Sequence, residues 1–140
     1  MEVKIKKLHP HAVIPRYSKP GDAGMDLTAI SKSQEYDIMT FGTGLAVEIP
    51  DGHVGLIFPR SSIFRTDLML SNAVGVIDSK FRGEIMFKFK INPVNSSAFY
   101  NVGERVGQLI IIPYPQIEFT EVDELSSTDR GEGGFGSTGK

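Results

Sequence analysis

The chain has 140 residues, a net charge of −2 and no cysteine. This length predicts one domain with a full hydrophobic core, and the balanced charge excludes the broad basic field typical of nucleic-acid binders. A chain without cysteine has no disulfide or thiolate chemistry, which fits a reducing compartment. No run approaches the roughly 20 apolar residues of a membrane span, and the first residues lack the apolar core of a signal peptide. We therefore expect a soluble, intracellular, cytoplasmic protein.

Short segments of alternating apolar and polar residues predict β-strands along the first half of the chain. Such alternation begins at residues 3–6, becomes clear again at 45–49 and continues at 53–58. Alternation with a period of two is typical of half-buried strands. Residues 15–24 contain two prolines and two glycines and predict a long loop. The Pro-Asp-Gly sequence at 50–52 predicts a tight turn.

Residues 63–70 are the one place where we expect a short helix. Ser61 and Ser62 precede it and are good N-caps. A helix start also offers free N–H groups and hydroxyl donors to an anion, and Arg60 stands beside it. Capping alone and an anion site both remain open.

The stretch 72–84 combines a strand pattern with reactive side chains. An apolar run at 74–77 ends at Asp78, followed by Phe81 and Arg82, and alternation resumes over 85–91. This pattern predicts a hairpin of strand, tight turn and strand. A hairpin mouth with an acid, a ring and a cation is either a polar turn, since turns collect Asp and Gly, or a small-molecule site.

The last third of the chain predicts two more strands and a tail. The apolar run 106–113, interrupted by Gln108, predicts a strand buried on both faces, and residues 117–122 predict a final short strand. Residues 126–140 include five glycines and cannot build a core. We therefore expect an all-β barrel or sandwich at 1–125 and a mobile arm at 126–140.

The tail allows two interpretations, a disordered end or a binding segment. Phe135 is an isolated ring among glycines, for which a linker has no use. Glycine-rich backbone with Arg130, Ser137 and Thr138 is suited to wrapping phosphates.

Several chemistries are excluded by missing motifs. No phosphate-loop motif and no serine nucleophile elbow occur, and His9, His11 and His53 have no second ligand at a useful spacing. One chemistry left open is a carboxylate base, for which Asp78 is well placed, that activates water against a phosphate held by cations and amides. Mg²⁺ would assist, because it keeps several waters and needs few protein carboxylates.

Five sequence motifs, in order, resemble those of the homotrimeric dUTPase family, the deoxyuridine triphosphate nucleotidohydrolases. They are AGMDLTA at 23–29, PRSS at 59–62, GVIDSKFRGE at 75–84, GERVGQL at 103–109 and RGEGGFGSTG at 130–139. The resemblance covers almost the whole chain. It implies a jelly-roll-like, distorted β-barrel that forms a homotrimer, with three sites at subunit interfaces and each tail lent to a neighbour as a lid.

The resemblance also implies a reaction, in which dUTP and water give dUMP and pyrophosphate. This reaction limits uracil incorporation into DNA and supplies dUMP for dTMP synthesis. By position, Asp78 would be the base that activates the water attacking the α-phosphorus, and Asp26 would reach Mg²⁺ through water. The positions implied in substrate binding are Arg60, Ser61, Ser62, Asn72, Gly75, Val76, Ile77, Phe81, Met86, Gln108, Arg130, Phe135, Gly136, Ser137 and Thr138.

Each group of these positions has an implied partner on dUTP. Asn72 and the backbone at 75–77 and near Met86 would bind uracil, and Phe81 would lie under the deoxyribose. Ser61, Ser62 and Gln108 would bind phosphates, and Arg130, Ser137 and Thr138 the γ end. Phe135 would stack on the uracil ring.

Three departures and two other functions bear on the resemblance. The positions of Lys80 and Phe81 usually hold an acid and a tyrosine in the family, and that of Ser62 often holds a glycine. A related deaminase family has a catalytic glutamate where this chain has Lys88, which argues against deamination. A purely regulatory nucleotide-binding scaffold is disfavoured because Asp78 and the tail are both present.

Overall fold

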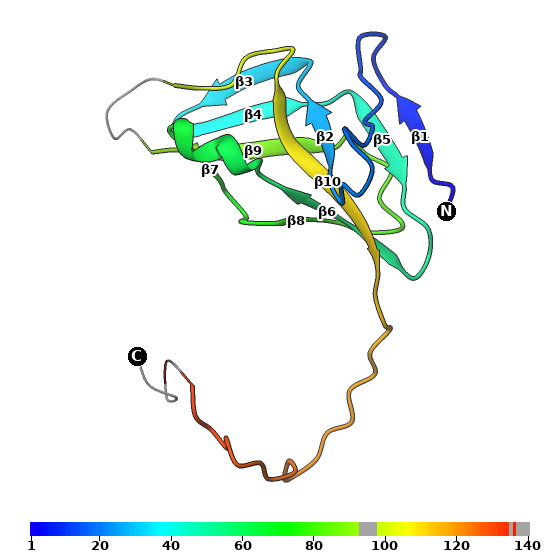
Figure 1. Ribbon diagram of the computed structural model, residues 1–140, viewed down its shortest axis with the longest axis vertical. Coiled ribbons are helices and arrows are strands. Elements are labelled where there is room, and N and C mark those ends of the chain that lie inside the picture. Colours follow the sequence, from blue (N-terminus) through cyan, green and yellow to red (C-terminus); the bar gives the residue numbers. More distant parts are fainter. Residues whose placement is uncertain (93–97, 135, 137–140) are drawn as a thin grey trace.

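The computed structural model describes residues 1–92, 98–134 and 136 and is built from β-strands, as expected. Figure 1 shows the strands packed together at one end and the C-terminal segment leading away from them. The elements are β1 Lys4–Lys7, β2 Met25–Thr28, β3 Ser31–Glu35, β4 Ile38–Gly42, β5 Leu45–Glu48, β6 His53–Phe58, the 3₁₀ helix η1 Ser61–Arg65, β7 Leu68–Leu70, β8 Gly75–Ile77, β9 Met86–Ile91 and β10 Arg105–Pro113. The described residues contain no helix that is long and apolar enough to span a membrane.

The strands form three sheets, all with antiparallel pairing. One four-stranded sheet has the order β2-β10-β6-β8, a second has the order β3-β4-β9-β7, and β1 pairs with β5. The all-β prediction is therefore confirmed, although hydrogen bonds do not close the sheets into a complete barrel among the described residues.

The core lies between the two four-stranded sheets and is rich in aromatic rings. Phe41, Phe87 and Phe89 are fully buried. The Phe87 and Phe89 rings are stacked with centroids 6.0 Å apart, and Phe41 meets Phe89 edge-on at 5.9 Å. Gly107 of β10 borders this cluster, because a Cβ there would overlap the Phe87 ring. The alternation predicted over 85–91 is thus confirmed as a buried face of β9.

The helix predicted over 63–70 is wrong in length and in type. The structure has only η1, whose bonds run from the Ile63 N–H to the Arg60 carbonyl and from the Thr66 N–H to the Ile63 carbonyl. No side chain caps its start, so the serines are not N-caps here. Residues 68–70 instead pair with β9, which buries Leu68 and Leu70. Tertiary pairing therefore overrides the local helical preference.

The hairpin predicted over 72–91 is also wrong in its pairing. β8 pairs with β6, whereas β9 pairs with β4 and β7, so the turn between them crosses from one sheet to the other. A hairpin and a crossover have the same alternation, because each strand needs only one buried face. The sequence pattern alone therefore could not separate them.

Two expectations for the C-terminal part also fail. Residues 117–122 form no strand, and Ile117 and Phe119 are largely exposed. β10 is buried on one face only within a single chain, since Ile110 is half-buried and Ile112 is 40% exposed. Beyond β10 the chain leaves the sheets (Figure 1), so the second face of β10 has no cover from these residues.

Candidate active site

A cleft of ≈ 330 Å³ lies beside β8 and the turn that follows it. Of the residues expected to bind the nucleoside, six line this cleft: Asn72, Gly75, Val76, Ile77, Phe81 and Met86. The packing requires a glycine at position 75, because a Cβ there would overlap the side chain of Ile57. The missing side chain leaves the β8 backbone open to a close approach.

The turn 78–84 is held by its own hydrogen bonds. The Phe81 N–H donates to the Asp78 carbonyl at 3.1 Å, and the Arg82 guanidinium donates to the carbonyls of Ser79 and Phe81 at 2.7 and 2.9 Å. The Phe81 ring lies over Gly83, since a Cβ on that glycine would fall 2.6 Å from Phe81 Cζ. The turn thus presents the ring to the cleft.

Asp78 follows β8 directly and is exposed. Its carboxylate makes no hydrogen bond with the described part of the chain, and it is not among the side chains that line the cleft. An exposed carboxylate without an internal partner can accept a proton from a water molecule. Arg82 bonds to backbone carbonyls of the turn instead of to this acid.

A second group of expected residues meets on β2, β10 and the loop after β6. Asp26 and Gln108 face each other across the β2–β10 pair, and the Gln108 side-chain amide donates to the Pro59 carbonyl at 3.1 Å. A Cβ on Gly24 would overlap the Gln108 side chain, so this glycine makes room for the amide. A cleft of ≈ 370 Å³ lined by Gly24, Asp26 and Gln108 lies here.

Two arginines share the carboxylate of Asp26. Arg60 Nε lies 3.1 Å from Oδ1 and Arg105 Nη1 lies 3.3 Å from Oδ2. The Asp26 and Arg60 side chains are 28% and 27% exposed, so this pair is partly shielded from solvent. Two cations around one acid leave a local positive charge, which suits an anionic ligand.

The two groups lie on opposite edges of one sheet. In the order β2-β10-β6-β8, Asp26 is on one edge strand and Asp78 follows the other. Three strand spacings correspond to about 14 Å, and no residue lines both clefts. Within one chain, the residues expected to bind the nucleoside and those expected to bind the phosphates therefore form two separate groups.

Ser61 and Ser62 follow Arg60 in η1, next to a tyrosine that the sequence did not indicate. Ser61 is exposed and Ser62 is half-buried. Burial raises the pKa of the Tyr100 phenol, while the neighbouring Ser62 hydroxyl and the Arg60 charge oppose that rise. The Tyr100 hydroxyl has no hydrogen-bond partner with good geometry within the described ranges. The sequence around Tyr100 contains no motif that would have predicted its place beside Ser62 and Arg60.

The glycine-rich tail does not approach either group in the described residues. Arg130 Nε donates to the Gly133 carbonyl at 3.0 Å, and the Gly131 N–H donates to the Thr128 carbonyl at 3.0 Å. Gly136 has a positive φ of 87°, which glycine readily adopts. The remaining expected positions, Phe135, Ser137 and Thr138, lie outside the described residues.

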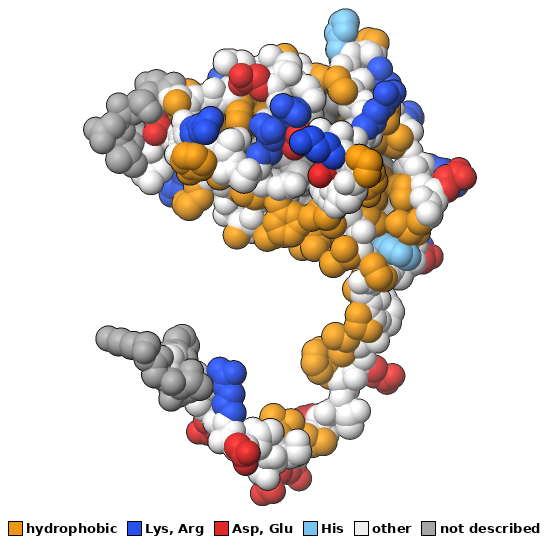
Figure 2. Space-filling model, in the orientation of Figure 1, with side chains coloured by type: hydrophobic (Ala, Val, Ile, Leu, Met, Phe, Trp, Pro, Cys, Tyr) orange, Lys and Arg blue, Asp and Glu red, His pale blue; other side chains and the backbone are white. Residues whose placement is uncertain are grey.

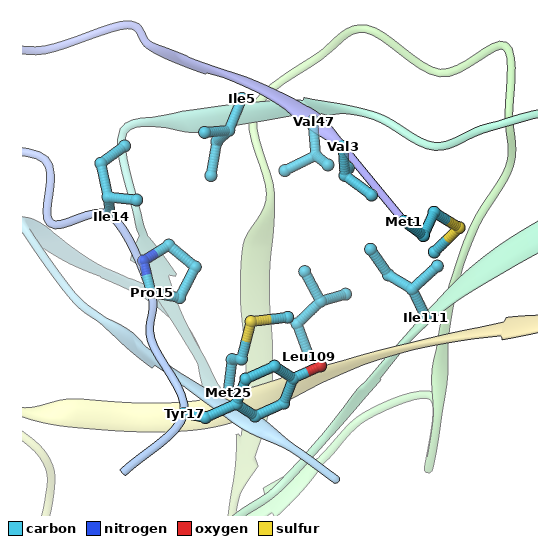
Figure 3. Close-up of a pocket in the computed structure, with 10 residues that line it drawn as sticks. All are labelled: Met1, Val3, Ile5, Ile14, Pro15, Tyr17, Met25, Val47, Leu109 and Ile111. Atoms are coloured by element: carbon cyan, nitrogen blue, oxygen red, sulfur yellow. The ribbon is translucent and has the colours of Figure 1, made fainter. Parts of the chain in front are cut away.

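An apolar pocket of ≈ 430 Å³ between β1, the 14–17 segment and β10 contains none of the expected residues. Figure 3 shows its lining, in which aliphatic side chains from these segments point toward one another and the Tyr17 hydroxyl is the polar group. Met25 adds a thioether at its floor. A pocket without charged or convergent polar side chains offers no means of orienting a nucleotide, so the two clefts whose linings include polar and charged side chains are the candidate site.

Comparisons with known proteins identify the family of this chain. The sequence profile described as dUTPase matches residues 10–139. A deoxyuridine 5'-triphosphate nucleotidohydrolase of Nautilia profundicola is 45% identical, with 100% of both chains covered, and that of Helicobacter hepaticus is 44% identical, with 99% of this chain and 89% of the relative covered.

A solved structure of a Staphylococcus bacteriophage 80alpha dUTPase variant with dUpNHpp superposes with a TM-score of 0.87 at 27% identity, covering 99% of each chain. This likeness confirms the jelly-roll-like fold that the sequence led us to expect. With the profile match and the bacterial relatives, it shows that this chain belongs to the dUTPase family.

Proposed function

We propose that this protein is a dUTP diphosphatase, which hydrolyses dUTP to dUMP and pyrophosphate. The observation that carries the proposal is the cleft beside β8, where six expected nucleoside-binding residues meet next to Asp78 in a chain of the dUTPase family. Cells with this activity limit uracil incorporation into DNA and obtain dUMP for dTMP synthesis. With its small nucleotide substrate and no broad basic field, the enzyme needs neither nucleic acid nor a membrane, and we place it in the cytoplasm.

The nucleoside would enter with its base against the β8 backbone. Peptide N–H and C=O groups at 75–77 and near Met86 can pair with the uracil edge, because Gly75 leaves the backbone uncovered. The Asn72 amide adds a donor and an acceptor. Phe81, 41% exposed at the cleft, offers its ring to the deoxyribose, where a 2′-hydroxyl would collide with it.

Asp78 would act as the general base. Its carboxylate takes a proton from a water molecule, the water oxygen bonds to the α-phosphorus, and the bond from that phosphorus to the bridging oxygen breaks. Pyrophosphate leaves with the electron pair of the broken bond. A positioned base of this kind contributes about 10²–10⁴-fold to the rate.

The phosphates would lie against the second group of residues. Arg60 and the hydroxyl groups of Ser61 and Ser62 supply donors, and Gln108 is held in place by the Pro59 carbonyl. The positive charge that Asp26 leaves unbalanced between Arg60 and Arg105 suits a triphosphate.

A complete site would form between copies of the chain, in a homotrimer. The strand that carries Asp26 and the strand that Asp78 follows lie about 14 Å apart across the sheet, and no residue lines both clefts, which supports a site shared between copies. Figure 2 shows a broad apolar surface over the part of the molecule where β6, β8 and β10 lie. Ile110, Leu56 and Val76 are register partners on β10, β6 and β8, and a second copy would cover this apolar row.

The arm 126–140 would close over the nucleotide bound at a neighbouring copy, while residues 1–125 form the β-domain. The arm's direction away from its own sheets supports this (Figure 1). Arg130 and Gly136, with Ser137 and Thr138, would hold the γ-phosphate end, and Phe135 would stack on uracil.

Mg²⁺ would arrive with the triphosphate. The described residues hold no cluster of three acidic or histidine ligands, and both oxygens of Asp26 already face arginines. This donor set fits a metal bound mainly by phosphate oxygens and water, with Asp26 reaching it through a water molecule. The bound ion would supply neutralisation of phosphate charge.

Deamination is the main competing activity for this fold, and Lys88 argues against it. Lys88 lines the nucleoside cleft at the position where the related deaminases have a glutamate. An ammonium group cannot accept a proton as a carboxylate does, so it cannot replace that glutamate.

A single assay tests the proposal. Purified protein with Mg²⁺ is given dUTP, dCTP, dTTP or UTP, and nucleotide and phosphate products are separated. We expect pyrophosphate and dUMP from dUTP and far slower turnover of the other three. Release of dUDP with orthophosphate would mean attack at the γ end, and conversion of dCTP to dUTP would support the deaminase.

A further inference from the structure

A β-bulge turns the Arg105 side chain toward Asp26. In the β2–β10 pair, Gln108 faces Asp26 and Gly107 faces Leu27, but the register then shifts so that Arg105, two residues further back, faces Thr28. A regular strand would place Arg105 on the opposite face of the sheet from Gln108, because side chains alternate. Bulges re-aim side chains in this way beside functional sites.

The burial of the neighbouring residue confirms the effect of the bulge. Val106 is fully buried, whereas the Arg105 side chain is 56% exposed. The turn before the bulge is anchored to the end of β2, since the Ala29 N–H donates to the Glu104 carbonyl at 2.9 Å and the Gly103 N–H donates to the Ala29 carbonyl at 2.8 Å. Arg105 is therefore held on the same face as Asp26 by backbone contacts on both sides.

The contact with Arg105 limits how Asp26 can hold Arg60. Arg105 Nη1 takes Oδ2, and Arg60 bonds to Oδ1 through Nε alone. Without Arg105, both oxygens would be available to Arg60, and a two-pronged pair with its terminal amino groups would be the favoured geometry. Such a pair would occupy the groups that a phosphate needs.

We propose that Arg105 is a positioning residue for triphosphate binding. By holding one carboxylate oxygen of Asp26, Arg105 prevents Asp26 from forming a bidentate pair with Arg60 and so leaves the Arg60 Nη groups directed at phosphate oxygens. This inference rests on the proposed function. It assigns Arg105 no contact with the nucleotide; its effect passes through Asp26 to Arg60.

The test compares Arg105→Met with a matched control, Lys90→Met. The control removes a cation of equal exposure from an ion pair, since Lys90 and Asp37 lie 3.4 Å apart and are each 56% exposed. We expect Arg105→Met to raise the KM for dUTP and the Kd for a non-hydrolysable imido analogue by about 10-fold, the scale of one charged hydrogen bond. Binding of deoxyuridine, which has no phosphate, should not change, and Arg105→Lys should recover part of the loss.

A double variant separates positioning from direct contact. In an Arg60→Ala background, Arg105→Met should lose most of its effect on binding, because Arg60 is no longer present to be positioned and only the loss of the Arg105 charge near the phosphates is left. An undiminished effect in that background, an unchanged KM in Arg105→Met, or equal weakening of deoxyuridine and dUTP would each overturn the inference. If the wild-type protein hydrolyses dUTP, any of these results overturns only the role of Arg105 and leaves the proposed function intact. If the wild-type protein does not hydrolyse dUTP, both the role of Arg105 and the proposed function are wrong.

Discussion

Lys80 and Asp51 join the turn after β8 to the turn before β6: Lys80 Nζ lies 2.9 Å from Asp51 Oδ1 and 3.2 Å from Oδ2. Lys80 stands at a position where the resemblance described above led us to expect an acid. The ion pair gives this lysine a structural partner, because an acid at the same place would face Asp51 with like charge. Both side chains are exposed, at 80% and 76%, so the contact is weakened by salt.

Lys80→Gln should therefore lower the melting temperature slightly at neutral pH and low salt. The Lys80 ammonium lowers the pKa of Asp51 in the folded protein, with the Ser79 hydroxyl as a second cause. The stabilisation is thus fully present above the ordinary carboxyl pKa of about 4 and is lost as the pH falls from there through the lowered pKa of Asp51 in the folded protein. Melting curves of both proteins at pH 7 and pH 3 check this, and a difference that is as large at pH 3 as at pH 7 contradicts it.

Asp78→Asn should abolish most turnover while leaving substrate affinity near that of the wild type. The amide cannot accept the proton from water, so kcat should fall by about 10²–10⁴-fold. The exposed carboxylate makes no hydrogen bond with the described residues, and its replacement should not alter the melting temperature. Stopped-flow kinetics with titration of an imido analogue measures both quantities, and a near-normal kcat would remove Asp78 from the role of base.

Deleting residues 126–140 should cripple hydrolysis and leave the β-domain folded. The described residues of this arm are exposed except for half-buried Gly133, so their removal costs the core nothing. Loss of Phe135 stacking alone corresponds to about 1–3 kcal/mol of nucleotide binding. The kcat/KM of the truncated protein and of Phe135→Ala, together with circular dichroism, checks this, and full activity after truncation would refute the role of the arm as a lid.

Gly107→Ala should destabilise the domain by about 1–3 kcal/mol, the range for overpacking a core. The added methyl group would overlap the Phe87 ring, which is fully buried and cannot move without displacing Phe89. Gly134→Ala is the matched control, since a Cβ there meets no atom within 4 Å. Denaturant unfolding measures both variants, and equal stability of the two would contradict the packing argument.

The predictions that the structure confirms are those that depend only on residues adjacent in sequence. The strand at 53–58 and the buried face over 85–91 follow from alternation, and the turn at 50–52 follows from Pro and Gly chemistry, with Gly52 at a φ of 75°. The segment 63–70 failed because Leu68 and Leu70 respond to β9, more than fifteen residues away in sequence. The final strand at 117–122 failed because an alternating segment needs a partner, and the chain offers none among its described residues.

The sequence by itself determined the family, the all-β class and six residues that line one cleft beside β8, because motifs and period-two alternation depend on neighbouring residues. Only the tertiary structure decided that the stretch around Asp78 crosses between sheets, that Asp26 stands on the opposite edge from it, and that Arg105 faces Asp26. These relationships depend on which strands pair and where a register shifts by one residue. Both are set by long-range backbone hydrogen bonds and core packing, which no local pattern encodes.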